Sequence, residues 1–94
     1  MIHILATVCI EDYAKFISVF TSNGKEARQR HGCRWTQVYS SIEPNQVVLL
    51  FDWSSRADFD GFLADSAVKE TMKESGTVGP PSFQFLDKIG ELPG

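Results

Sequence analysis

The chain has two histidines, and each stands where it could act as a base near neutral pH. His3 lies in an apolar N-terminal run, and His31 lies at the end of a helical pattern. Imidazole is the side chain whose ordinary pKa allows it to gain or lose a proton roughly between pH 5 and 8. A neighbouring carboxylate orients an imidazole and raises its basicity, and Asp52 is the candidate partner of His3. Proton abstraction by a histidine is therefore one chemistry that the sequence offers.

A second group of residues could hold a ligand. Arg28 could anchor an anionic or phenolate-like group through its planar fork of donors. Trp35 and Tyr39 share one face of a predicted strand, and with Trp53 near the end of the next strand they could line a pocket for a planar ligand. Three further aromatic residues could contact the same ligand: Phe16, Phe20 and Phe62.

Each of these residues also has an ordinary structural interpretation. His3 and Asp52 could form a cross-strand pair at the sheet margin, and His31 could cap or pack a helix end, where an imidazolium is favoured. Arg28 could form a surface ion pair. Large aromatic residues in a small domain are often part of the core or of a dimer interface.

Several common chemistries have no signal in the sequence. It contains no glycine-rich phosphate loop, no His-x-x-x-His pair, no nucleophile elbow and no Cys-x-x-Cys motif. Residues 76–81 read as a turn, because their prolines lack the N–H groups that cradle phosphate. Cys9 and Cys33 do not make the set of about four ligands that zinc requires. We therefore expect no metal and no cofactor, and an activity that depends on a shaped pocket with a few polar groups.

The composition indicates one domain over residues 1–94. The chain is 43% hydrophobic with a net charge of −3, and its length is usual for a single domain. Its nine Lys and Arg residues are scattered, which disfavours binding to the phosphates of nucleic acid. No apolar run approaches the roughly 18–20 residues that cross a bilayer, and the N-terminal run has no cationic flank. We expect a cytoplasmic protein that binds neither nucleic acid nor membrane.

Hydrophobic periodicity predicts four strands. Residues 1–10 form an unbroken run rich in β-branched residues, which is typical of a strand covered on both faces. Further strand patterns cover residues 33–41, 46–53 and 82–86. Residues 42–45 read as a hairpin loop between the second and third strands.

Two helices are predicted between these strands. Residues 12–31 carry one apolar stripe at helical spacing, with the pair 23–24 as a weak point where the helix could bend. Residues 55–58 have the form of a capping box that starts the second helix. That helix ends at Gly76, with a possible jog at 65–66.

The element order β-α-β-β-α-β predicts a ferredoxin-like α+β fold, with a four-stranded antiparallel sheet and both helices on one face. Right-handed crossovers fix the strand order, numbered along the chain, as 4-1-3-2. The first strand then runs antiparallel to the third. A self-consistent register pairs His3 with Asp52, Leu5 with Leu50 and Thr7 with Val48.

The helices of this fold leave one sheet face uncovered. Residues 1–10 and 47–51 are apolar at successive positions, so both faces of these strands should be covered. A domain of this length buries only about 60–68% of the surface of its unfolded chain. We expect a second copy of the chain to cover the bare face, so that the protein is a homodimer.

The chain resembles the dimeric α+β barrel superfamily, which includes antibiotic-biosynthesis monooxygenase-type domains and polyketide cyclase-like proteins. The resemblance covers nearly the whole length and rests on residues that determine the fold: Asp12-Tyr13, Phe20, Ala27-Arg28, Gly32, Pro44-Asn45, 47–54, Phe62 and 76–81. It implies a homodimer whose two sheets form a barrel, with a ligand cavity in each subunit between sheet and helices. Relatives that degrade haem carry a Trp and a His where this chain has Phe62 and Met72, so the resemblance implies no haem.

The leading hypothesis is a small homodimeric barrel that binds an apolar, aromatic or polyketide-like metabolite. It would act on that metabolite without metal or nucleotide, as a monooxygenase, cyclase or isomerase. His3 with Asp52, or His31, would be the general base, and the arginine and aromatic residues named above would contact the ligand. The alternative is a non-catalytic ligand-binding or assembly module, in which the histidines are structural and the bare sheet face serves only to dimerise.

Overall fold

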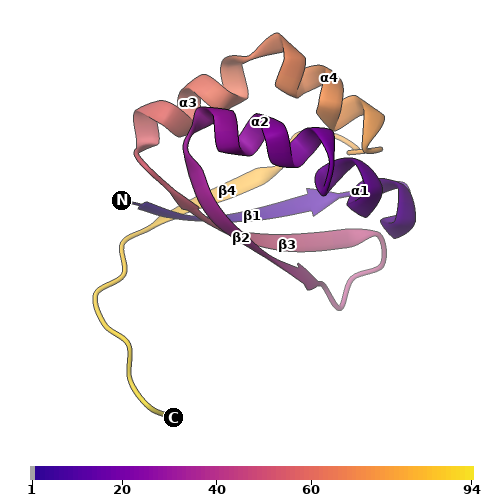
Figure 1. Ribbon diagram of the computed structural model, residues 1–94. Helices are drawn as coiled ribbons and strands as arrows, with labels where there is room; N and C mark the ends of the chain where they lie inside the picture. The colour runs from indigo at the N-terminus through magenta and orange to yellow at the C-terminus, as the bar shows by residue number, and fades with distance from the viewer. Residues whose placement is uncertain (1) are drawn as a thin grey trace.

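The computed structural model describes residues 2–94 and places four strands in one antiparallel sheet (Figure 1). The strands are β1 (Ile2–Cys9), β2 (Cys33–Ser40), β3 (Gln46–Trp53) and β4 (Ser82–Leu86). Their spatial order is β2-β3-β1-β4, which confirms the predicted order. Met1, the first residue of the predicted strand 1–10, lies outside the described residues.

Four short helices cover one face of this sheet (Figure 1). They are α1 (Tyr13–Phe20), α2 (Asn23–His31), α3 (Arg56–Ala64) and α4 (Ser66–Glu74). Each of the two predicted helices is divided into two, the first at residues 21–22, beside the predicted weak point 23–24, and the second at Asp65, at the predicted jog. Within residues 2–94, no helix is long and apolar enough to cross a membrane.

Local hydrogen bonds explain both divisions. The hydroxyl of Thr21 donates to the carbonyl of Ile17, and that of Ser22 donates to the carbonyl of Ser18, each over 2.7 Å. Such side-chain bonds compete with the helical hydrogen bonds of the backbone. Asp65 takes an extended conformation, with φ −72° and ψ 121°, and its carboxylate caps α4 by accepting the N–H of Ala67.

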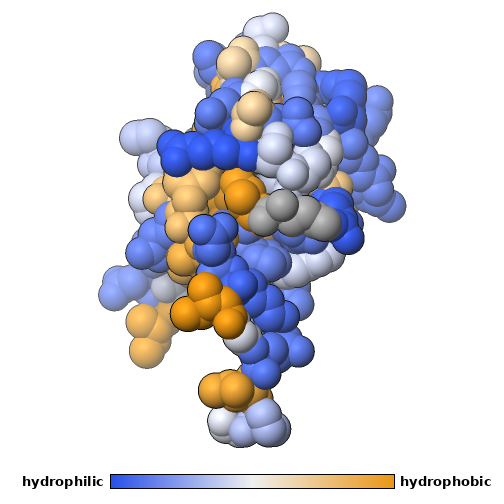
Figure 2. Space-filling model, turned by 90° about the vertical axis from the view of Figure 1, so that its left-hand side faces the viewer, coloured by the Kyte–Doolittle hydropathy of each residue, from blue (hydrophilic) through white to orange (hydrophobic). Residues whose placement is uncertain are grey.

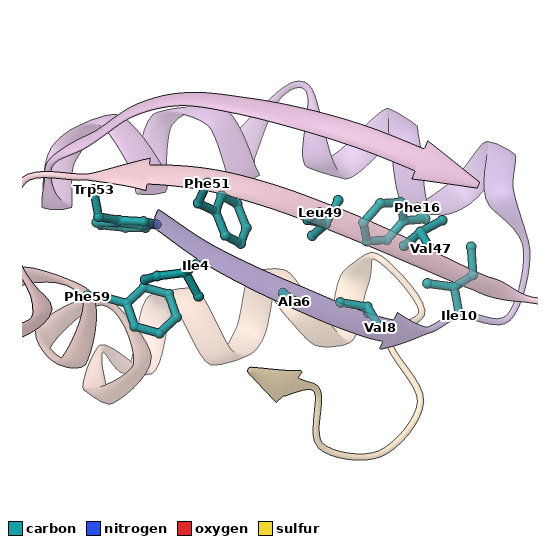
Figure 3. Close-up of a cluster of buried hydrophobic side chains, with 10 residues drawn as sticks. All are labelled: Ile4, Ala6, Val8, Ile10, Phe16, Val47, Leu49, Phe51, Trp53 and Phe59. Atoms are coloured by element: carbon teal, nitrogen blue, oxygen red, sulfur yellow. The ribbon is translucent and has the colours of Figure 1, made fainter. Parts of the chain in front are cut away.

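The hydrophobic core lies between the sheet and the helices. Alternate side chains of β1 and β3 point into it, as Figure 3 shows for Ile4, Ala6, Leu49 and Phe51. At one end of the core, Trp53 and Phe59 are both completely buried, and their rings meet edge to face with centroids 5.2 Å apart.

The other sheet face, called the outer face below, is not covered by any helix within residues 2–94. The β1–β3 register pairs His3 with Asp52, Leu5 with Leu50 and Thr7 with Val48, as predicted. These residues lie on the outer face, because the intervening residues point into the core. The sheet is open, with β2 and β4 as its edges, so one chain alone does not form a closed barrel.

Apolar residues are exposed on this side of the molecule. Trp35 and Tyr39 on β2 are 40% and 52% exposed, and Leu86 on β4 is 40% exposed. The segment after β4 extends away from the body of the molecule and exposes Ile89 and Leu92 (Figures 1 and 2). Figure 2 shows, from the side, separate hydrophobic groups among hydrophilic ones below the helical layer.

Gly32, at the end of α2, takes a conformation that other residues rarely adopt. Its φ is +105°, and its carbonyl accepts the N–H of Ser54 over 3.0 Å. A Cβ at this position would overlap the Ser54 hydroxyl. Gly79 also has a positive φ, of +70°, but a Cβ there would meet nothing within 4 Å.

Gly32→Ala should therefore destabilise the fold by about 2–4 kcal/mol, since backbone strain and steric overlap act together. Gly79→Ala is the matched control and should cost about 1 kcal/mol, because only the strain applies. Urea denaturation of both variants measures the two free energies of unfolding. Equal losses in the two variants would show that the Ser54 contact has no effect.

Candidate functional site

An apolar cavity of about 70 Å³ lies between the sheet and the helical layer. Its wall brings together four of the predicted ligand contacts, namely Phe16, Phe20, Arg28 and Phe62. The rings of Phe16 and Phe20 are stacked, with centroids 5.0 Å apart. Pockets for drug-sized ligands usually measure about 300–1,000 Å³. A polycyclic ligand therefore needs side chains of the wall to move.

Arg28 is the charged residue of this wall. Its side chain is held by Phe20, whose ring centroid lies 3.7 Å from the guanidinium carbon. Its Nη1 donates to the carbonyl of Phe20 over 2.8 Å. Because Phe20 is the last residue of α1, Arg28 satisfies a carbonyl that the helix leaves unpaired.

The position of Arg28 depends on Gly24 and on burial. A Cβ on Gly24 would lie 3.2 Å from Nη1, so the glycine leaves room for the guanidinium. Arg28 is only 9% exposed, and burial lowers its pKa from the ordinary value. Within residues 2–94, no carboxylate lies within ion-pair distance of Arg28. A buried cation without a counter-ion favours a ligand that carries negative charge.

His31 forms a close pair with a carboxylate that the sequence analysis did not assign to the site. Its Nε2 lies 2.8 Å from Oδ2 of Asp65, and Nη2 of Arg30 lies 3.1 Å from the same oxygen. The imidazole also meets the edge of Phe62, with ring centroids 5.8 Å apart. His31 is therefore outside the cavity wall, with Phe62 between the imidazole and the cavity.

His3 and Asp52 lie on the outer face, so the sheet separates them from the apolar cavity. Nε2 of His3 is 3.8 Å from Oδ1 of Asp52, which is too long for a hydrogen bond. Asp52 is buried, and Nε of Arg34 lies 3.6 Å from its Oδ2. The Trp35 ring covers His3, with the two ring centroids 5.6 Å apart.

The predicted aromatic cluster of Trp35, Tyr39 and Trp53 is not formed. After a β-bulge between Cys33 and Trp35, Trp35 and Tyr39 share the outer face, opposite Asp52 and Val48. Trp53 points into the core, because it directly follows Asp52 and neighbouring strand residues face opposite ways. Of the predicted ligand contacts, Trp35 and Tyr39 thus lie across the sheet from the cavity.

The family model described as antibiotic biosynthesis monooxygenase (ABM) matches residues 1–74 of the chain. The chain belongs to this family. This assignment confirms the predicted resemblance, and the ABM family accounts for the element order and for the open sheet. Comparison with curated proteins finds no match.

Solved structures with the ABM fold superpose on most of the chain. SnoaB, a cofactor-independent oxygenase from Streptomyces nogalater, gives a TM-score of 0.75 at 14% identity, with 99% of this chain and 97% of SnoaB covered. A candidate antibiotic biosynthesis monooxygenase from Caulobacter crescentus gives a TM-score of 0.74 at 20% identity, with 95% of this chain and 90% of that protein covered. Rv0793 from Mycobacterium tuberculosis gives 0.67 at 17% identity, with 98% of each chain covered. Identities this low establish the shared fold alone.

The cavity of this ABM-family protein combines an apolar lining with one cation that can stabilise negative charge. Arg28 and a few hydroxyl groups interrupt a wall that is otherwise apolar, and a cation acts strongly on a ligand in such a site. Among the wall residues that the structure describes, none is an imidazole or a carboxylate. Likewise, no group of three or more His, Cys, Asp and Glu residues within 2–94 could hold a metal ion.

Asp65 should give this ABM-family protein an acid-sensitive contact between α2 and α4. Its pKa is lowered from 3.8 to about 2, chiefly by the hydrogen bond to His31 and then by those to Ala67 and Arg30. A lowered carboxyl pKa stabilises the fold above the unfolded value, and this stabilisation is lost as the pH falls from about 4 towards 2. Asp65→Asn should thus be less stable than the wild type at neutral pH, and the difference should shrink across that window.

Urea denaturation between pH 2 and pH 7 measures this difference. Asp60→Asn is the control, because the Asp60 carboxylate on α3 makes no ion pair or hydrogen bond with the described residues. If the difference in free energy of unfolding between Asp65→Asn and the wild type stays constant with pH, the charge of the Asp65 carboxylate is not the cause of that difference.

Proposed function

We propose that this protein is a cofactor-independent oxygenase that binds a small aromatic substrate, as its anion, in the cavity between sheet and helices. The observation that carries the proposal is an apolar, aromatic wall with one buried cation, in a chain of the ABM family. SnoaB, which has a similar fold, is a cofactor-independent oxygenase, and this likeness favours the same class of reaction.

The residues of the wall would have separate roles. Phe16, Phe20 and Phe62 would pack against the substrate ring and exclude water, while Arg28 would stabilise the phenolate or enolate through charge and hydrogen bonds. The cavity volume of about 70 Å³ favours a single ring over a polycyclic metabolite. A larger substrate would require the helices to move outward.

His31 is the proposed general base. Its imidazole is oriented by Asp65 at 2.8 Å and lies one side chain away from the cavity, against Phe62. After a movement of Phe62 that opens a path to the imidazole, His31 would take a proton from the substrate, and the resulting anion would reduce dioxygen. For a phenol, one oxygen atom would enter the ring as a carbonyl in place of one C–H bond, the phenolic O–H would become the second carbonyl, and the other oxygen atom would leave as water.

We further propose that the protein is a homodimer through the outer face. This face carries Leu5, Leu50, Trp35 and Tyr39, which one chain leaves without a covering layer. An exposed apolar sheet face on a domain of this size is typical of an interface. His3 and Asp52 would then lie in or beside the dimer contact, where a structural role suits them.

Dioxygen uptake tests the proposed activity. The purified protein is mixed, in buffer with a chelator, with a panel of single-ring, two-ring and three-ring phenols, and oxygen is followed with an electrode. We expect turnover of at least one phenol with no added metal or nucleotide, and faster turnover of smaller rings. Binding of phenols without any oxygen uptake would instead favour the non-catalytic module, which the lack of a base within the cavity wall also favours.

Variants at Arg28 and His31 assign the roles. Arg28→Met should lower kcat about 10²-fold, because it removes the charge and keeps much of the contact with Phe20. His31→Gln should lower kcat about 10²-fold or more, because it removes the proposed base. Lys69→Met, on the exposed surface of α4, is the control. Unchanged kcat in either site variant would rule out the role proposed for that residue.

A further inference from the structure

A second cavity, of about 190 Å³, opens at the surface between α2 and β2. Lys25, Arg28 and Gln29 of α2 form one wall, and residues 33–36 of β2 form the other. We call it the polar cleft. It shares only Arg28 with the apolar cavity, so the guanidinium lies between the two spaces.

The polar cleft is positively charged, although the chain as a whole is acidic. It gathers Lys25, Arg28 and Arg34, three of the nine Lys and Arg residues in a chain of net charge −3. No Asp or Glu belongs to its described wall. Arg34 also forms an ion pair with Asp52: Nε of Arg34 lies 3.6 Å from Oδ2 of Asp52, which is on the outer side of the sheet. Coulomb attraction in such a concave site raises the local concentration of anions.

Arg28 gives the polar cleft a buried cation with unused donors. A guanidinium group has five N–H donors, and within residues 2–94 that of Arg28 makes one hydrogen bond, to the carbonyl of Phe20. The side chain is 91% buried, since only 9% is exposed. A charge in this position is costly until an anion pairs with it.

Neutral polar groups complete the wall. Gln29 adds an amide group, and Thr36 adds a hydroxyl group that lies 3.5 Å from the Cys33 sulfur. Amide and hydroxyl groups can donate to oxygen atoms of a ligand in addition to the charged groups. Lys25 and Arg28, which make no ion pair with the described residues, and these neutral donors are suited to the oxygens of a carboxylate or phosphate.

We propose that the polar cleft binds a small oxyanion, the carboxylate or phosphate group of a metabolite. This site shares Arg28 with the apolar cavity but does not depend on the proposed oxygenase activity. A protein that oxidises no phenol would still bind the anion here, because Lys25 and Arg34 have no part in the apolar cavity.

The two cysteines provide a readout with an internal control. Cys33 lies in the wall of the polar cleft, whereas Cys9 is exposed at the opposite end of β3, beside Gln46. Both are free thiols. An anion bound in the cleft should slow the alkylation of Cys33 and leave that of Cys9 unchanged.

The experiment alkylates the protein with iodoacetamide, an uncharged reagent, and measures both cysteines by mass spectrometry. Inorganic phosphate and benzoate are titrated separately, at an ionic strength held constant with sodium chloride. We expect saturable protection of Cys33 by at least one of them. Protection by phosphate alone assigns a phosphate ligand, protection by benzoate alone a carboxylate ligand, and protection by both a site for either group.

Charge variants decide whether the cleft is the site. The double variant Lys25→Gln, Arg34→Gln should bind the protecting anion about tenfold or more weakly, through loss of charge-assisted hydrogen bonds. Lys69→Gln with Lys73→Gln on α4 removes the same charge elsewhere and should change affinity less than about twofold. If the first double variant does not fold, Lys25→Gln alone replaces it. The proposal fails if neither anion protects Cys33, if Cys9 is protected equally, or if both double variants lose affinity alike.

Discussion

Leu50→Glu should convert the proposed dimer into a monomer. Leu50 lies on β3, a central strand, and on the outer face it has Leu5 on one side and Gln37 on the other. A carboxylate there would be buried without a partner in a two-copy interface. Because a two-fold interface contains each substitution twice, the dissociation constant should rise by at least about 10³-fold.

Tyr13→Glu is the control for this variant. Tyr13 is 52% exposed at the start of α1, on the helical side of the molecule and away from the outer face. Like Leu50→Glu, the change replaces a large side chain by a carboxylate. Sedimentation or light scattering at micromolar concentration gives the mass. The dimer proposal fails if the wild type is a monomer of 10.5 kDa under these conditions, or if Tyr13→Glu dissociates equally.

Phe59→Ala should cost about 3–5 kcal/mol, a large part of the roughly 5–15 kcal/mol that stabilises a typical domain. Phe59 is completely buried, and its ring contacts five other aromatic rings among the described residues. Three of these, Phe51, Phe62 and Phe83, belong with Phe59 to the cavity wall. The variant should therefore lose ligand binding as well as stability, with a melting temperature lower by more than about 10 °C.

Phe85→Ala is the matched control, because it removes the same atoms from a ring that is 38% exposed. Phe85 contacts Phe59 and lies under the Arg56 guanidinium, at 3.9 Å, but it does not line the apolar cavity. We expect it to cost about 1–2 kcal/mol, since the site is already half open to water. Equal losses for both variants would show that burial does not determine the effect.

The strand order and register could be predicted because they follow from few rules. Four apolar runs, two right-handed crossovers and one hairpin permit few arrangements, and the pairing of His3 with Asp52 then follows from the alternation of side chains. The same alternation places His3 and Trp53 on opposite faces. Which face the helices cover is not set by alternation, so the sequence did not show that His3 lies away from the cavity.

The sequence marked weak points at 23–24 and 65–66, but the hydrogen bonds that interrupt the first helix and the partner of His31 could not be predicted, for different reasons. The apolar stripe of residues 12–31 continues through Thr21 and Ser22, so periodicity gives no sign of their bonds to the preceding turn. His31 and Asp65 are 34 residues apart, and no short motif links them. Four of the predicted ligand contacts did meet in one wall, since Phe16, Phe20 and Arg28 come from one amphipathic stretch.

The division of the helical layer affects how fast a ligand can enter. Each of the four helices has only eight or nine residues, a length that is barely stable in isolation. A helix of this kind can detach and return on its own, while the sheet keeps its hydrogen bonds. Amide exchange should thus be faster in α1 and α4 than in β1 and β3. Residues at the two joints, such as Ser22 and Asp65, would then control the rate of substrate exchange without touching the substrate.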